Sequence, residues 1–138
     1  MTARLLIPPI VAAILLGVPV LASGSGLKLI GEDTAHGLDP YPQATGTAHR
    51  PRALFIKVDV VATHPEDGVV ESDFEGDTQC NAGGRGSPVK VKKFSFPATG
   101  PLMRKLPKPK GRPDTCFVNA RAFTGGVATV TVQLFAKK

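Results

Sequence analysis

Alternation of apolar and polar side chains predicts two half-buried β-strands. Segment 53–62 alternates with its apolar members at Leu54, Ile56, Val58 and Val60. Segment 127–135 has the same period of two, with apolar members at Val130, Val132 and Leu134. This period is that of a strand with one face in a core. Segment 116–123 comes just before, and because Thr124-Gly125-Gly126 joins the two, we predict an antiparallel hairpin.

Two further segments have a weaker strand pattern. Segment 69–74 is interrupted by charges, and segment 89–96 mixes apolar residues on both faces. No stretch has a helical period, and the β-branched, Gly-rich and Pro-rich composition opposes helices. We therefore predict an all-β domain over residues 52–138. It should be a small antiparallel β-sandwich, immunoglobulin-like in architecture, of five to six strands with one disulfide.

Segment 23–51 differs from the rest in composition. It is dense in Gly, Ser, Thr, Pro, Asp and His, and only Leu27–Ile30 resembles a strand. We expect an extended leader that either contributes one edge strand or stays mobile in solution.

The amino-terminal residues have the anatomy of a signal peptide. Arg4 supplies a positive charge, segment 5–21 has no charged or strongly polar side chain, and small residues follow Leu21. We predict a signal peptide over residues 1–22, cleaved after Ala22. A membrane anchor is disfavoured because the run is shorter than about 20 residues and contains three prolines. The protein is thus expected to be secreted, either outside the cell or, in a bacterium, in the periplasm or cell envelope.

Two cysteines, Cys80 and Cys116, remain after the predicted cleavage. In an oxidising compartment they should form a disulfide. A closed loop of this length should stabilise the fold by roughly 3 to 4 kcal/mol in the chain-entropy model. A metal-binding or reactive thiol pair is disfavoured, since no CxxC spacing or nearby histidine accompanies them, and no cofactor is expected.

Charge is segregated along the chain, whose formal net charge is +6. Segment 59–77 holds seven acidic residues and no base, whereas segment 85–112 holds nine bases and no acid. If the two segments lie on different faces, the basic side should concentrate a polyanion. If they are neighbouring strands, cross-strand pairs should neutralise them.

The proline-rich loop predicted over residues 98–114 is long enough to be functional. A polyanion could bind the basic side chains of this loop. A protein partner could instead fit the proline-stiffened loop and contact its apolar side chains Leu102, Met103 and Leu106. One version of the second alternative is an inhibitory loop that offers Arg104 or Lys105 to a trypsin-like protease. The predicted binding residues are Lys90, Lys92, Lys93, Leu102, Met103, Arg104, Lys105, Leu106, Lys108, Lys110 and Arg112.

The sequence gives little support for metal binding, catalysis or nucleic-acid binding. The acidic segment 71–77 partly resembles a calcium loop, but Ala82 stands where a bidentate Glu is needed, so no metal ligand is assigned. His36, His49 and His64 lack neighbours that would orient a catalytic imidazole, and catalytic motifs are absent. Nucleic acid is a disfavoured partner because the exported chain has no Trp and one Tyr.

We therefore expect a secreted, non-enzymatic binding module with an extracellular or cell-surface partner. The leading hypothesis is an anionic polymer bound by the basic, proline-rich loop. The alternatives are a protein-recognition domain, such as a protease inhibitor or secreted effector, and a structural envelope component.

Overall fold

The computed structural model describes residues 26–81 and 88–138 of the chain. The signal peptide predicted over residues 1–22 lies outside the described residues. Eight strands and a short 3-10 helix, Pro65–Asp67 (η2), form the fold. The strands are β1 (Leu27–Leu38), β2 (Gln43–His49), β3 (Ala53–Ala62), β4 (Ser72–Asn81), β5 (Val89–Ala98), β6 (Leu102–Lys105), β7 (Thr115–Thr124) and β8 (Val127–Lys137). No helix in these two ranges is long and apolar enough to span a bilayer.

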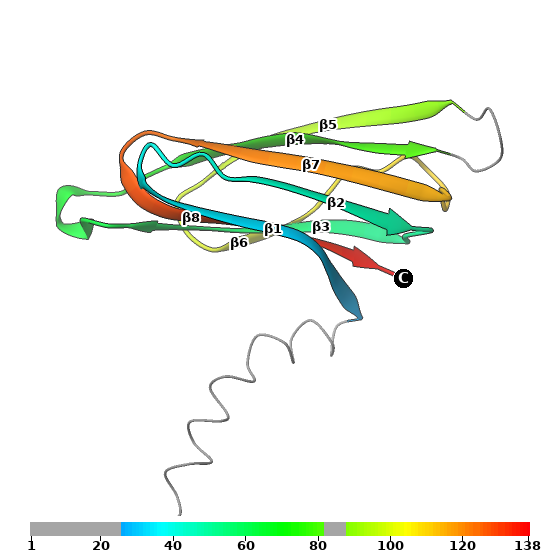
Figure 1. The fold of residues 1–138 in the computed structure, drawn as a ribbon, viewed down its shortest axis with the longest axis horizontal. Helices are drawn as coiled ribbons and strands as arrows, with labels where there is room; N and C mark the ends of the chain where they lie inside the picture. The colour runs from blue at the N-terminus through cyan, green and yellow to red at the C-terminus, as the bar shows by residue number, and fades with distance from the viewer. Residues whose placement is uncertain (1–25, 82–87) are drawn as a thin grey trace, which may run out of the picture.

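The strands form two antiparallel four-stranded sheets that pack face to face (Figure 1). The first sheet has the order β1-β8-β3-β6, and the second has the order β2-β7-β4-β5. The prediction of an all-β antiparallel sandwich with one disulfide is confirmed. Eight strands occur instead of five to six, because the leader contributes two strands and the predicted loop contributes one.

The core lies between the inner faces of the sheets. The predicted alternation of β3 and β8 places Ile56 and Leu134 in this core without solvent exposure. From the second sheet, Phe74 and Val118 are equally buried, and the rings of Phe74 and Phe96 stack with centroids 5.6 Å apart. Burial of such side chains is the main driving force for joining the two sheets.

The described part of the predicted leader, residues 26–51, forms two strands, where at most one edge strand was expected. β1 pairs with β8, and β2 pairs with β7, so this segment supplies an edge strand to each sheet. The inner face of β2 consists of Ala44, Gly46 and Ala48, which are all buried. These side chains are too small to give a strong apolar signal. The sandwich therefore begins at β1 and not at residue 52.

The predicted hairpin between β7 and β8 is wrong. β7 pairs with β2 and β4, whereas β8 pairs with β1 and β3. Both strands have a continuous buried face, and these faces oppose each other across the core. The glycine turn carries the chain from one sheet to the other. Its backbone is held by Asp39, whose N–H donates to the Gly126 carbonyl (2.7 Å) and whose Oδ1 accepts from the Gly126 N–H (2.9 Å).

The disulfide joins neighbouring strands of the second sheet. Cys80 in β4 lies directly opposite Cys116 in β7, with their Cα atoms 4.1 Å apart. β4 begins at Ser72, three residues later than the strand predicted at 69–74, because Val69 and Glu71 are exposed in the link that follows η2. The disulfide lies at the end of the sandwich where the chain leaves β4 and enters β7.

Candidate functional site

The structure combines both alternatives for the segregated charges. Acidic β4 and basic β5 are paired neighbours, with Asp77 directly opposite Lys93. On the other side of β4, Glu75 Oε2 lies 3.6 Å from Nη2 of Arg121 in β7. Charges of opposite sign are therefore adjacent across the middle of the second sheet. The two ends of the sandwich, in contrast, carry opposite charges.

One end of the molecule, which we call the basic end, gathers cations from segments far apart in the sequence. It is formed by the start of β1, the β2–β3 link, the start of β5, the segment 105–114 and the end of β8 (Figure 1). Among the described residues of this end, Asp114 is the one with an acidic side chain. All but one of its ten basic residues are exposed, and Lys108 is half-buried. They are Lys28, Arg50, Arg52, Lys90, Lys105, Lys108, Lys110, Arg112, Lys137 and Lys138.

The opposite end, which we call the acidic end, is formed by the β1–β2 turn, the β3–β4 link and the start of β4. Its exposed carboxylates are Asp39, Glu66, Asp67, Glu71 and Asp73. Segments 36–42 and 60–73 contain no Lys or Arg. The molecule thus has an electrostatic polarity along its long axis.

The predicted loop over residues 98–114 has more regular structure than expected. Residues Leu102–Lys105 form the edge strand β6, which pairs with β3. The main chain of Arg104 and Lys105 is therefore part of a sheet and does not protrude as an inhibitory loop would. Leu106 is only 3% exposed and belongs to the core, so it is not available as an apolar contact for a partner.

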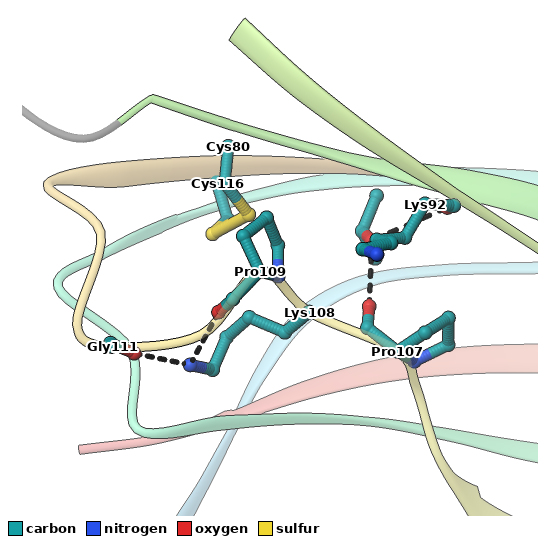
Figure 2. Close-up of a disulfide and its surroundings, with 8 residues drawn as sticks. Cys80, Lys92, Pro107, Lys108, Pro109, Gly111 and Cys116 are labelled. Atoms are coloured by element: carbon teal, nitrogen blue, oxygen red, sulfur yellow. Dashed lines mark hydrogen bonds between the residues drawn. A yellow bond between two sulfur atoms is a disulfide. The ribbon is translucent and has the colours of Figure 1, made fainter.

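The remaining segment, 106–114, is bonded to β4 of the second sheet at Pro107 and is closed by a hydrogen bond within itself, from Lys108 to Gly111 (Figure 2). The buried Thr78 hydroxyl donates to the Pro107 carbonyl at 2.6 Å. Lys108 Nζ donates to the Gly111 carbonyl at 2.6 Å and lies 3.4 Å from that of Pro109. Lys108, predicted as a binding residue, therefore closes its own loop.

The end of this segment is bonded to the end of β4 and to the β2–β3 link. The Asp114 N–H donates to the Asn81 carbonyl (3.0 Å), and the Asp114 carbonyl accepts from the Arg50 N–H (2.8 Å). Arg112 Nε donates to the Arg50 carbonyl at 3.0 Å. Pro109 and Pro113 are buried. The segment is thus fixed in place before any ligand arrives.

The other predicted binding residues divide between the basic end and the middle of the molecule. Lys90, Lys105, Lys110 and Arg112 lie at the basic end, whereas Lys92 and Lys93 lie further along β5. Arg104 lies over the Phe96 ring, with Cζ 4.8 Å from the centroid, which is a cation–π contact. Leu102 packs against the core, and Met103 remains 44% exposed.

Sequence reasoning missed five of the ten basic residues of the basic end. Arg50 and Arg52 precede β3, and Lys137 and Lys138 lie at the end of the chain. Ala53 pairs with Lys137, which brings these segments together. The sequence does show basic residues next to the two clearest strands. Only the pairing of these strands shows that the basic residues lie close together in space.

Shallow hollows lie at both ends of the described part of the molecule. Two are at the basic end, and both are lined by Pro109 and Lys110. Another, of about 420 Å³, lies at the acidic end, where the exposed rings of Tyr41 and Phe123 are 5.0 Å apart. In the described part of the chain, no group of three or more His, Cys, Asp or Glu side chains is arranged to hold a metal ion.

No protein-family model and no curated protein sequence matches this chain. Solved structures with a general likeness include TmCBM61 in complex with β-1,4-galactotriose, at TM-score 0.44 and 9% identity, covering 82% of this chain and 90% of that one. A second is the family 11 carbohydrate-binding module from Clostridium thermocellum in complex with a β-1,3-1,4-mixed-linked tetrasaccharide, at TM-score 0.31 and 12% identity, covering 80% and 81%. Similarity this low carries no functional argument, so function must be argued from the residues of this chain.

Proposed function

We propose that this protein is an exported, non-catalytic binding module that attaches to an anionic polymer through its basic end. The observation that carries the proposal is the gathering of ten cationic side chains and one carboxylate, Asp114, at one end of the sandwich. Export is supported by the disulfide between Cys80 and Cys116, since disulfides persist in oxidising compartments.

A polymer with repeated charges fits this surface better than a small anion. The cations come from five separate segments and are spread over the whole end of the sandwich. A polymer that contacts several of them releases several bound counterions, and this release drives binding. The acidic end should repel the same polymer, which favours an end-on orientation.

Two competing partners are supported less well. A protein partner bound by Leu102, Met103 and Leu106 would need three exposed side chains, but Leu106 is in the core. Nucleic acid bound as a single strand would use aromatic stacking. The exposed aromatic rings of Tyr41, Phe117 and Phe123 belong to the second sheet and its rim, and the segment 105–114 contains none.

The test measures the affinity of the purified protein for immobilised heparin and for immobilised inorganic polyphosphate across a series of salt concentrations. We expect the affinity for at least one polymer to fall by about tenfold or more between 50 and 200 mM salt, roughly as for two phosphate contacts. Uncharged dextran serves as the control surface. Affinity that does not depend on salt, or equal binding to dextran, would contradict the proposal.

A further inference from the structure

Two hollows at the basic end share two lining residues, Pro109 and Lys110, which we call the ridge. The first hollow, of about 170 Å³, is also lined by Asn81, Lys90 and Arg112. The second is wider, about 490 Å³, and is also lined by Arg52, Lys105 and Lys108. Each hollow therefore has several cations on its walls, and Lys110 is common to both.

The first hollow has the donors that an oxyanion needs. Lys90 and Lys110 supply ammonium groups, and Arg112 supplies a guanidinium whose direction is set by the bond from its Nε to the Arg50 carbonyl. This bond leaves the Nη donors of Arg112 unused, since none of the described residues accepts from them. A planar guanidinium fork matches the oxygens of sulfate and phosphate groups.

Asn81 provides a second, independent sign of a polar ligand. Its Oδ1 is buried and has no hydrogen-bond partner within the two described ranges. Buried polar side-chain atoms in proteins nearly always have a partner. This oxygen is an acceptor, so its partner would be a hydroxyl or N–H donor of the ligand or a water molecule, and the oxyanion itself is left to the cationic side chains.

The ridge is rigid before binding. Figure 2 shows the Lys108 ammonium bridging the carbonyls of Pro109 and Gly111, with the disulfide of Cys80 and Cys116 beside Pro109. The disulfide residue Cys80 lines the first hollow beside Pro109. A surface held in this way loses little conformational entropy when a ligand binds.

We propose that the ligand is a linear polymer with a sulfate or phosphate group on each repeat, and that it crosses the Pro109–Lys110 ridge with one oxyanion in each hollow. This inference rests on the proposed function and adds to it the chemistry of the ligand and its place at the basic end. Sulfate esters and phosphodiesters share the oxyanion chemistry that these donors recognise. Because Lys110 lines both hollows, it should contribute more to binding than other exposed cations of the same end.

The experiment compares Lys110→Gln with a matched control, Lys28→Gln, which removes the same charge from an exposed position at the same end but away from the ridge. Affinities are measured for heparin octasaccharide and heparin disaccharide, and for long-chain polyphosphate and pyrophosphate. We expect Lys110→Gln to weaken binding of the preferred long polymer by about tenfold, as for loss of a charge-assisted hydrogen bond. Lys28→Gln should weaken it by about twofold or less.

The outcomes separate this inference from the proposed function. Tighter binding of heparin identifies sulfate as the group, and tighter binding of polyphosphate identifies phosphate; both support the inference if the disaccharide and pyrophosphate bind much more weakly. If long polymers bind but Lys110→Gln and Lys28→Gln have equal effects, the ridge is not the site, although the proposed function stands. If neither polymer binds the unchanged protein, the proposed function fails.

Single-stranded DNA bound more tightly than both polymers, with no effect of Lys110→Gln, would also overturn the inference. Thermal unfolding of each variant shows that the fold is intact.

Discussion

Gly31 and Gly46 lie where the backbones of β1 and β2 come closest, at the edge where the two sheets meet. A Cβ atom on Gly46 would overlap the carbonyl group of Ile30, and one on Gly31 would overlap that of Thr45. A backbone N–H of β2, that of Gln43, donates to Asp33 Oδ2 in β1 across the same edge at 2.8 Å. At this edge the absence of a side chain sets the distance between the sheets.

Replacing Gly46 with Ala should therefore destabilise the protein. The overlapping atoms of Ile30 are backbone atoms as well as its side chain, so relief requires the strands to move apart. We expect the free energy of unfolding to fall by about 3 kcal/mol, as for other overpacked positions. The measurement is equilibrium denaturation. Gly100→Ala is the control, because a Cβ at Gly100 would meet no atom within 4 Å, and its stability should be unchanged. Equal stability of the two variants would show that the edge is looser than described.

At the scale of the element, the alternating pattern predicted strands well and their pairing poorly. β3 extends over Ala53–Ala62, as the sequence predicts, because its inner side chains are large and apolar. β2 and the part of β1 beyond Ile30 were missed because their inner positions are small or polar residues, such as Asp33 and Ala35 in β1 and Ala44 and Gly46 in β2. The hairpin prediction failed because alternation shows which face is buried but does not identify the neighbouring strand.

Only part of the candidate site could be predicted, because the sequence shows local patterns but not which distant segments lie together. The cluster of bases in segment 104–112 is visible in the sequence, but the burial of Leu106 and the internal bonds of Lys108 depend on how the segment packs. Arg50 and Lys137 reach the same end only through the pairing of β3 with β8. Contacts between distant segments carry no local signal.

The segment 106–114 has one anchor that can be removed without changing its own sequence. Replacing Thr78 with Val keeps the shape of a fully buried side chain but leaves the Pro107 carbonyl without its donor. We expect the free energy of unfolding to fall by about 1 to 3 kcal/mol, the cost of an unsatisfied buried group. Denaturant titration measures it. Thr47→Val, at an exposed position of β2, is the control and should be neutral. A neutral Thr78→Val would mean that the bond to Pro107 does not hold the segment.

At the scale of the whole molecule, the main property is the opposite charge of its two ends. The strands run between these ends, and a ten-residue strand such as β3 is about 33 Å long at roughly 3.3 Å per residue. This separation exceeds the Debye length of about 8 Å at physiological salt. Charges at the acidic end should therefore influence a ligand at the basic end only when salt is low.

Neutralising the acidic end tests this separation. In the double variant Glu66→Gln with Asp67→Asn, both changed residues are exposed and lie in η2. We expect binding of heparin or polyphosphate to change by about twofold or less at 150 mM salt, with a larger gain in affinity at 10 mM, where the Debye length is about 30 Å. Isothermal titration calorimetry at both salt concentrations gives the comparison. A large gain at 150 mM would show that the polymer reaches the acidic end.

The most direct test of the account is to map the bound polymer on the protein by NMR. Backbone amide shifts are recorded while heparin octasaccharide or polyphosphate is added at low salt. We predict that shifts concentrate in segments 50–52, 89–91 and 105–114, which belong to the basic end, while segments 36–42 and 60–73 do not change. Shifts centred on Tyr41 and Phe123, or no shifts with either polymer, would contradict the claim that the basic end is the binding surface.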